Sequence, residues 1–362
     1  MTSSLPPSLQ NFLSQGPVAA MGGGIHPAGW RLLRTAFISA LLLLGLTLPI
    51  GTEPPSGQAI FDDVAARVKS FPSREAFILL DHSRMGDVRY IKDNMRRALA
   101  EKKRTFNNTS FAREMQSAHQ ATQPPFHIPW FLEDDKTLDN VAVLCPRTHR
   151  AASWTAGIPT PAGMRAVPPF SDSDSLRHEI YHEVFGHGTE RMYPPAFPVN
   201  KSPHERALWE MRADIVAMAL MAREDGHAGF GHAFALMRSL RSLHYLQLGT
   251  RTNDQAWIDT ACSYNNGLEI ERAARILDNI FASPEHGAAF RARHETFTIT
   301  LANRIFSAVA CPKDAYDARS EALRDIALGK PANSPLAAHI KAAQKRIFRP
   351  VFSPMKTLAP AP

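Results

Sequence analysis

The stretch His178–His187 reads His-Glu-Ile-Tyr-His-Glu-Val-Phe-Gly-His, and it decides how the rest of the chain is interpreted. Shortly before it, at Ser171–Asp174, lies a run of serines and aspartates. Such side chains favour a helix start because they accept hydrogen bonds from the free backbone N–H groups of the first turn. The stretch is therefore predicted to be helical, with its histidines available as metal ligands.

Two ligand registers overlap in this stretch and share His182. In the first, His178 and His182 flank Glu179, and residues four apart on an α-helix point about 40° apart around the axis. In the second, His182 and His187 flank Glu183, and residues five apart point about 140° apart. The second pair can face one ion only if the helix carries an extra residue, as a π-bulge does. The glycine that precedes the last histidine suits such a distortion.

A second helical segment supplies carboxylates. Ser202–Glu205 forms a capping box with proline at the first helical position, which predicts a helix start at residue 203. Glu210 and Asp214 then lie in one otherwise apolar stripe, and buried carboxylates need a cation or hydrogen-bond donors. We expect Glu210 to bind a metal and Asp214 to accept the N–H of a histidine ligand. The competing interpretation is that Arg212 or another arginine pairs both carboxylates.

Two histidines, a distant carboxylate and a neighbouring glutamate are what a hydrolytic zinc site requires. The ligands hold Zn²⁺ and leave a fourth position for water, and the glutamate acts as general base. In the second register the ligands and the base are His182, His187, Glu210 and Glu183. In the first they are His178, His182, Glu210 and Glu179. The sequence therefore predicts a zinc-dependent peptide hydrolase in which metal-bound water attacks the scissile carbonyl.

Regular helix geometry favours the first register, and sequence context favours the second. The residues beside histidine ligands in zinc-peptidase helices are mostly uncharged because the motif is buried. The first register has Arg177 before its first histidine and Glu183 after its second, whereas the second register is flanked by apolar and aromatic residues. Both registers stay open on the sequence.

The segment His182–Gly188 resembles the HExxGH-G motif of the dipeptidyl peptidase III family of zinc exopeptidases. The segment Glu210–Asp214 is similar to that family's second motif, E-x-R-A-E/D. The resemblance implies a gluzincin-type site with His182, His187 and Glu210 as zinc ligands and Glu183 as the base. It covers only these two short motifs, and the gap between them is shorter than in that family. We therefore expect a similar metal site and no specific dipeptidyl-peptidase activity.

The hydrophobic pattern from Ser171 onward is almost entirely helical. Helices are predicted at 228–247, 253–262, 267–281, 285–308, 314–328 and 334–347, and in the first half at 60–68 and 85–103. Short strands are predicted at 77–80 and 141–144. The expected fold class is mainly α: a helical zinc-metallopeptidase-like catalytic domain over residues 59–350, with a few strands in the N-terminal half and a disordered tail at 351–362.

The N-terminal part has the pattern of an export signal. Arg31 and Arg34 precede the uncharged segment 35–52, which is typical of a signal peptide or a signal anchor and is just long enough to span a bilayer. Residues 1–34 are rich in Gly, Pro and Ser and are expected to be disordered, and 53–58 is expected to be a linker. The protein is thus expected to be exported, periplasmic or extracellular, and either released or anchored in the membrane.

Composition limits the partners. The chain has 362 residues and a net charge of +7, but its basic residues are scattered rather than arranged in a stripe with aromatic residues. No nucleic-acid partner is therefore expected, and the expected partner is a peptide or protein substrate. Three cysteines without a CxxC pair argue against a cysteine-based zinc site.

Two other functions fit the same residues. One is an envelope protein in which the metal is structural or the site is inactive, and the other is a zinc amidase that acts on the cell wall. A hydrolase also needs a donor for the tetrahedral oxyanion. The downstream candidates are His227, His232, His244, Tyr245 and Tyr264.

Overall fold

The chain divides into two units, Met1–Pro55 and Ser56–Pro362, and the computed structural model describes parts of the second. The described residues are 57–69, 76–80, 84, 86–101, 126–130, 141–145, 157–160, 163–166, 172–192, 202–331 and 333–348. Among them, no helix is both long and apolar enough to cross a membrane. The predictions for residues 1–34, 35–52 and 351–362 lie outside the described residues.

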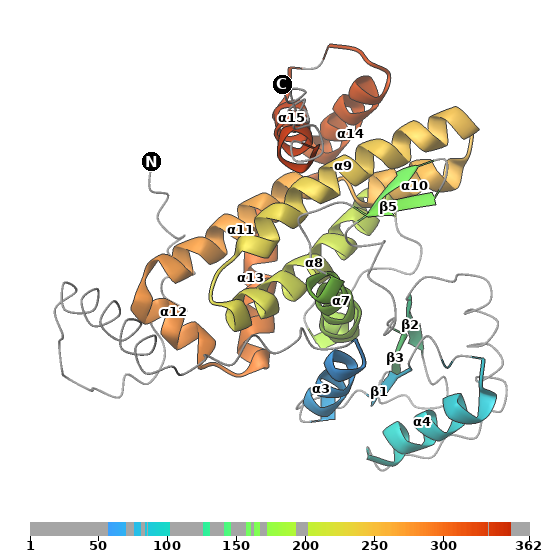
Figure 1. Cartoon of the computed structure of the whole chain (residues 1–362), viewed down its shortest axis with the longest axis vertical. Helices are drawn as coiled ribbons and strands as arrows, with labels where there is room; N and C mark the ends of the chain where they lie inside the picture. The colour runs from blue at the N-terminus through green and yellow to red at the C-terminus, as the bar shows by residue number, and fades with distance from the viewer. Residues whose placement is uncertain are drawn as a thin grey trace, which may run out of the picture. The chain divides into compact units, whose positions relative to one another are not determined.

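The described part of the chain is mainly helical, as predicted (Figure 1). The elements are α3 (Gly57–Lys69), α4 (Val88–Glu101), α7 (Asp172–Tyr181), η2 (His182–Gly186), η3 (His187–Met192), α8 (Pro203–Asp225), α9 (Gly229–Thr252), α10 (Gln255–Ser263), α11 (Gly267–Ala282), α12 (Pro284–Arg291), α13 (Glu295–Val309), α14 (Lys313–Ala327) and α15 (Pro335–Phe348). Because α3 begins at Gly57, the last two residues of the expected linker are helical.

The prediction of a single helix at 285–308 is wrong. The chain forms two helices there, α12 and α13, and leaves helical geometry between Arg291 and Glu295. His294 begins the second helix, because its ring accepts the backbone N–H of Thr296 at 3.3 Å. A histidine that accepts such a bond does what a Ser or Asp cap would do, and the hydrophobic pattern does not reveal it.

Short strands precede the histidine stretch. Strands β1 (Ala76–Leu79), β3 (Val141–Cys145) and β2 (Phe126–Trp130) form a sheet in that order, with β1 parallel and β2 antiparallel to β3. Strands β4 (Gly157–Thr160) and β5 (Gly163–Ala166) form a separate antiparallel pair. Strand β3 contacts η2 and η3, and β4 contacts α9, so both pieces of β-structure lie beside the helices described below.

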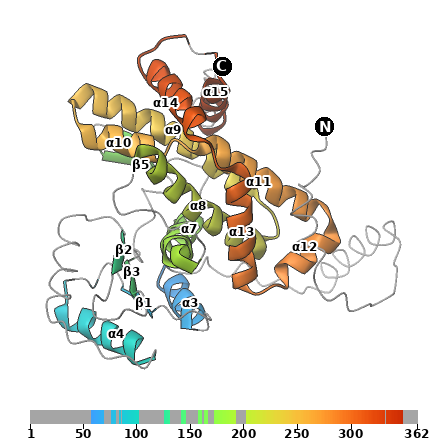
Figure 2. The same ribbon diagram turned by 180° about the vertical axis from the view of Figure 1, so that it is seen from behind.

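Helix α8 is the central helix of the core (Figures 1 and 2). Its predicted start is confirmed, because Ser202 Oγ accepts the N–H of Glu205 and the Glu205 carboxylate accepts the N–H of Ser202. Every residue from Met211 to Ala222 is buried, so the helix is covered on all sides. It contacts α7, η2, α10, α11 and α13. It ends at Gly226, whose left-handed backbone (φ 76°) favours glycine.

Helix α9 organises the C-terminal part of the core. It packs against α10, α11 and α15, and Leu240 lies in one apolar cluster with Leu323 of α14 and Ile340 of α15. The same helix buries two cations, Arg238 and Arg241. Buried arginines need acidic or hydrogen-bonding partners, so their position leads to the site between α7, α8 and α9.

Candidate metal centre

The histidine stretch is helical throughout, but its pitch changes at His182. Helix α7 continues as the π-helix η2 and then as the 3₁₀ helix η3. The N–H of His187 reaches the carbonyl oxygens of both Glu183 and His182, four and five residues earlier. The wider turn inserts the extra residue that the second register requires. As a result, the Nε2 atoms of His182 and His187 lie 3.1 Å apart.

Gly186 allows this π-helical turn to lie directly on α8. A Cβ at this position would lie 2.6 Å from Cβ and 2.7 Å from Cα of Ala213, closer than side-chain atoms normally approach. The fully buried Arg212 fastens the same turn, because it donates to the carbonyl oxygens of Gly186 (2.7 Å) and Thr189 (3.3 Å) and to Asn303 Oδ1 (2.7 Å). Arg212 therefore holds the backbone of the turn.

Three ligand atoms converge between this turn and α8. His182 Nε2, His187 Nε2 and a carboxylate oxygen of Glu210 lie within 4.8 Å of one another. The distance from His182 Nε2 to Glu210 Oε2 is 3.4 Å. In a tetrahedral zinc site with bonds of about 2.0–2.2 Å, neighbouring ligand atoms are about 3.3–3.6 Å apart. The residues present therefore fit a zinc ion.

Asp214 orients His182 from the side opposite these ligands. Its Oδ1 lies 2.8 Å from His182 Nδ1 and also accepts from Arg238 Nη2 at 2.6 Å. Burial alone would raise the pKa of Asp214, but the charges of Arg238 and His182 outweigh it and hold this pKa at about 2. The ionised carboxylate favours a proton on Nδ1 of His182, so that Nε2 is the nitrogen that faces the other ligands. The competing interpretation, in which an arginine pairs the two carboxylates of α8, is met for Asp214 by Arg238, whose Nη2 also lies 4.0 Å from Glu210 Oε2.

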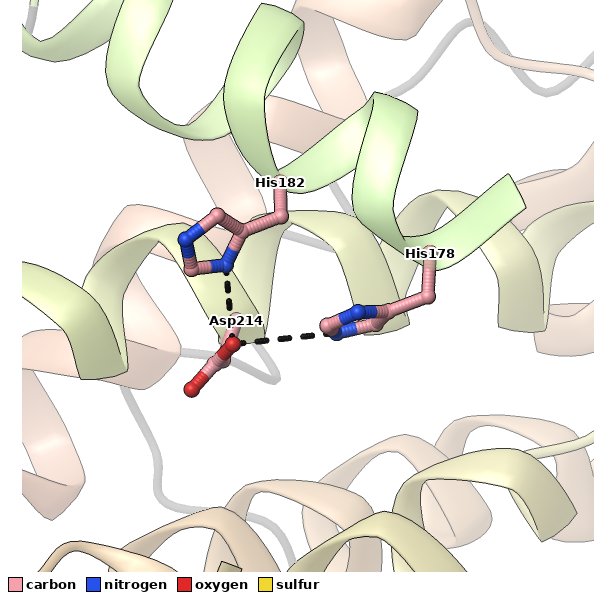
Figure 3. Close-up of side chains that lie close together, drawn as sticks. All are labelled: His178, His182 and Asp214. Atoms are coloured by element: carbon pink, nitrogen blue, oxygen red, sulfur yellow. Dashed lines mark hydrogen bonds and ion pairs between the residues drawn. The ribbon is translucent and has the colours of Figure 1, made fainter. Parts of the chain in front are cut away.

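His178 belongs to a different group. It points from α7 at Asp214, with 3.7 Å from its Nε2 to Asp214 Oδ1 (Figure 3). Its ring packs against Phe230 and Phe234, with centroids 5.2 Å and 4.2 Å away. His178, His182 and Asp214 form a second compact group of potential metal ligands. The structure thus gathers these two histidines around Asp214, whereas the first register expects them to share a metal with Glu210.

The charge of Arg238 makes that second group the poorer cation site. Its guanidinium donates to the same Asp214 oxygen that faces both histidines. His182 Nδ1 is engaged with this oxygen, so its lone pair is not free for a metal. The geometry therefore favours the register with His182, His187 and Glu210.

Glu183 is the buried carboxylate of the π-helical turn, next in sequence to His182. Burial raises the pKa of Glu183 to about 7; the charge of His182 lowers it, and those of Glu210 and Asp214 raise it. A carboxyl group whose pKa lies near neutrality can both accept and return a proton. Glu179, the base of the alternative register, is also buried but lies on the regular helix α7.

Two residues that the sequence did not indicate shape the centre. The Trp209 ring lies against the His187 ring, with centroids 3.8 Å apart and planes inclined by 35°. This contact limits rotation of the ligand ring. Arg238 reaches Asp214 from α9. Trp209 could have been suspected from its place next to Glu210, but no local pattern indicates Arg238, because its partner lies on another helix.

The candidate oxyanion donors are dispersed. His227 accepts a backbone N–H at the start of α9, and His232 lies between two carboxylates of α11. Tyr245 lies further along α9, stacked on a tryptophan of α10. Tyr264 follows α10, and its ring centroid lies 4.1 Å from the guanidinium carbon of Arg238. Tyr264 is therefore a candidate that contacts a residue of the centre.

Comparisons with protein-family models, with curated proteins and with solved structures found no match. The resemblance to dipeptidyl peptidase III motifs thus rests on the segments His182–Gly188 and Glu210–Asp214 alone. What the centre can do is inferred below from the positions, burial and charges of its own residues.

Proposed function

We propose that the protein is a zinc-dependent peptide hydrolase. The observation that supports this is the π-helical turn, which gathers the ligand atoms of His182 and His187 with Glu210 and carries the buried Glu183 between the two histidines. Two imidazole nitrogens and one carboxylate oxygen suit zinc, and three protein ligands leave one position open. The described helices would then form a metallopeptidase-like catalytic domain, with the short strands in its N-terminal half.

Each residue of the centre has a separate role in this proposal. A zinc ion bound there supplies a Lewis acid that polarises a carbonyl and lowers the pKa of water. Glu183 takes the proton of the attacking water and delivers it to the leaving amine. Asp214 fixes the ring of His182 and Trp209 that of His187, so little ordering is needed when substrate binds.

Glu183 also supports hydrolysis over a structural metal site. Burying a carboxylate without a partner is costly, and a metal held only for stability does not need one beside its ligands. The raised pKa of Glu183 indicates that the surrounding residues do not compensate for its burial. Such a group is useful where a proton moves. A zinc amidase acting on the cell wall would use the same residues, so the substrate decides between these two hydrolases.

The decisive experiment compares Glu183→Gln with Glu179→Gln in the full-length, zinc-loaded protein. Zinc is measured by elemental analysis, and hydrolysis by mass spectrometry of a peptide mixture and of cell-wall fragments. We expect Glu183→Gln to keep its zinc and to slow peptide hydrolysis by about 10²–10⁴-fold. Glu179→Gln makes the same change to a buried carboxylate of α7 and should stay within about threefold of wild type, since a carboxylate that transfers no proton does not supply the catalysis of a general base.

Each other outcome favours a named alternative. Cleavage of cell-wall fragments but not of peptides indicates the amidase. Zinc binding without cleavage of either substrate indicates a structural or inactive site. A loss of activity in Glu179→Gln but not in Glu183→Gln assigns the base to the first register.

We further propose that the protein is exported by means of residues 35–52. The support is the apolar, uncharged composition of this segment behind Arg31 and Arg34. Fractionation of cells that produce the full chain tests it. Recovery outside the cytoplasm, either free or with the membrane, is expected, and recovery in the cytoplasmic fraction would contradict it.

A further inference from the structure

A partly buried arginine of α3 reaches the place where the histidine stretch changes its pitch. Tyr181 is the last residue of α7, and the π-helical turn η2 begins at the next residue, His182. Tyr181 is buried, and its phenol oxygen accepts a hydrogen bond from Nη2 of Arg67. Helix α3, which carries Arg67, lies beside α7 (Figures 1 and 2). A helix from the N-terminal half thus contacts the residue next to a candidate zinc ligand.

The same phenol connects the turn to α8, the helix that supplies the carboxylates of the centre. The O–H of Tyr181 donates to Glu224, whose two carboxylate oxygens lie 2.9 Å and 3.0 Å from it. Nη1 of Arg67 donates to Glu224 Oε1 and to Glu295 Oε1 of α13, both at 2.9 Å. Arg67, Tyr181 and Glu224 therefore close a ring of hydrogen bonds between α3, α7 and α8. Because each group has two partners in this ring, Tyr181 is held more firmly than by a single hydrogen bond.

Arg67 also contacts the aromatic side of the turn. Its guanidinium carbon lies 5.0 Å from the ring centroid of Tyr181 and 5.5 Å from that of Phe185. Both distances are within the range of a cation–π contact. The two rings pack edge to face with centroids 5.6 Å apart, and Phe185 is a buried residue of η2. One side chain of α3 therefore contacts the residue before the turn and a residue within it.

These contacts concern the zinc ligands because the turn must keep its π-helical geometry. In a regular helix the rings of His182 and His187 would point about 140° apart. In the π-helical turn their Nε2 atoms lie 3.1 Å apart. Such turns are rare, so this one depends on the side chains around it. Arg212 holds its end through the carbonyl oxygen of Gly186, and Arg67 contacts its beginning.

We propose that Arg67 is a positioning residue of the metal centre, which acts through Tyr181 to hold the beginning of the π-helical turn and with it the ring of His182. This inference rests on the proposed function, which assigns the metal to these ligands. An arginine suits the role because its planar guanidinium donates to Tyr181, Glu224 and Glu295 together. A lysine keeps the charge but lacks this fork of donors.

The test compares Arg67→Lys with Arg223→Lys in the full-length protein. The two arginine side chains are 18% and 20% exposed, and both pair with Glu295. Arg223 is the matched control because its hydrogen-bond and ion-pair partners among the described residues are Glu295 and the carbonyl oxygen of Arg291, not Tyr181.

The main measurement is zinc affinity by competition with a chelator, which does not depend on hydrolysis. We expect Arg67→Lys to weaken zinc binding by about tenfold or more, as loss of a group that orients a ligand does, and Arg223→Lys to stay within about threefold of wild type. With zinc in excess, Arg67→Lys should lower kcat for a cleaved peptide and change KM little, because the ligands and not the substrate contacts are displaced.

Tyr181→Phe tests whether the effect passes through the phenol. This change keeps the ring and removes the hydroxyl that joins Arg67 to Glu224. It should weaken zinc binding about as much as Arg67→Lys. The double variant should lose no more than either single variant, since changes within one network are not additive.

A purely structural role gives a different result. It lowers the denaturant concentration at which the zinc-free protein unfolds, and it leaves zinc affinity and kcat of the folded protein unchanged. That result in Arg67→Lys overturns the positioning role and leaves the zinc hydrolase standing. An equal loss of zinc affinity in Arg223→Lys also overturns it, because the cause is then the ion pairs around Glu295. Additive losses in the double variant contradict the action through Tyr181.

The two proposals fail in different ways. Wild type that binds zinc but cleaves no peptide overturns the proposed hydrolase, and chelator competition then decides the role of Arg67. Wild type that binds no zinc overturns both proposals. If Arg67→Lys does not fold, Tyr181→Phe decides the question, and wild-type zinc affinity in that variant overturns the positioning role.

Discussion

The two halves of the histidine stretch carry the same pair of residues in different environments. The α-helical half begins with His178-Glu179 and the π-helical half with His182-Glu183, and all four side chains are buried. The ring of His178 lies among phenylalanines, and burial lowers its pKa. The ring of His182 faces carboxylates, which raise its pKa to about 10 although burial opposes them.

The difference indicates that neighbours on other helices decide whether a His-Glu pair is suited to bind a metal. Residues His182 and His187 meet only because the π-helical turn moves the second ring round to the first. In the α-helical half, His178 and His182 already have a suitable spacing of four residues. The carboxylate that they face is Asp214, however, and Asp214 is already paired with Arg238. Helical spacing alone would favour the α-helical half, whereas the proposed metal site lies in the π-helical half.

The largest effect is expected when the two outer histidines, His178 and His187, are substituted one at a time. His187→Ala removes one of three ligands and should lower zinc affinity by more than about 100-fold, beyond what changes around a ligand cause. His178→Phe replaces a neutral ring among aromatic rings and should leave zinc affinity within about threefold. Competition with a chelator measures both. Zinc loss in His178→Phe with retention in His187→Ala would move the metal to the α-helical half.

A smaller effect is expected behind the shared ligand. Asp214→Asn removes the charge that orients His182 and should weaken zinc binding by about 10–100-fold. Asp317→Asn is the matched control, since this exposed carboxylate pairs with Lys313, one turn earlier on the same helix. Chelator competition again gives the affinities. Unchanged zinc binding in Asp214→Asn would mean that Asp214 serves to pair with the buried Arg238 and does not orient the zinc ligand His182.

The packing of the π-helical half predicts a cost in stability. Gly186→Ala places a methyl group against Ala213 and should lower the free energy of unfolding by about 1–3 kcal/mol. Gly86→Ala, where no atom lies within 4 Å of the new Cβ, should stay within about 0.5 kcal/mol. Denaturant unfolding of the zinc-free proteins measures both. Equal stability would show that the turn does not depend on close contact with α8.

The smallest expected effect is a shift in pH dependence. Burial raises the pKa of Glu183 to about 7 without metal, and a bound cation lowers it, because it stabilises the carboxylate. A general base must be ionised, so kcat/KM should rise with pH to a plateau, with its acid midpoint below about 7 and a slope of about tenfold per unit. Glu183→Asp should move this midpoint, whereas Glu179→Asp should not. If the midpoint of the fall in kcat/KM at low pH is the same in Glu183→Asp as in wild type, the fall is caused by another group.

Much of the helical framework was predictable because its signals are local. The start of α8 follows from Ser202–Glu205, whose hydrogen bonds lie within one turn. The single helix predicted at 285–308 failed where a histidine replaced the usual cap residue. Asp214 was expected to orient a histidine because a buried carboxylate on an apolar stripe needs a donor, and the structure shows that contact with His182.

The local sequence determined the residue types of the centre and the helices that carry them. It placed histidines and glutamates in one helix and two carboxylates one turn apart in another, and it marked Gly186 as a place where the helix could widen. Only the tertiary structure decided which histidines meet. The π-helical turn forms where Gly186 lies against Ala213 and Arg212 donates to the Gly186 carbonyl oxygen. In the α-helical half, the positive charge that pairs with Asp214 comes from Arg238 on α9. These contacts join residues on different helices, so no spacing along the chain encodes them.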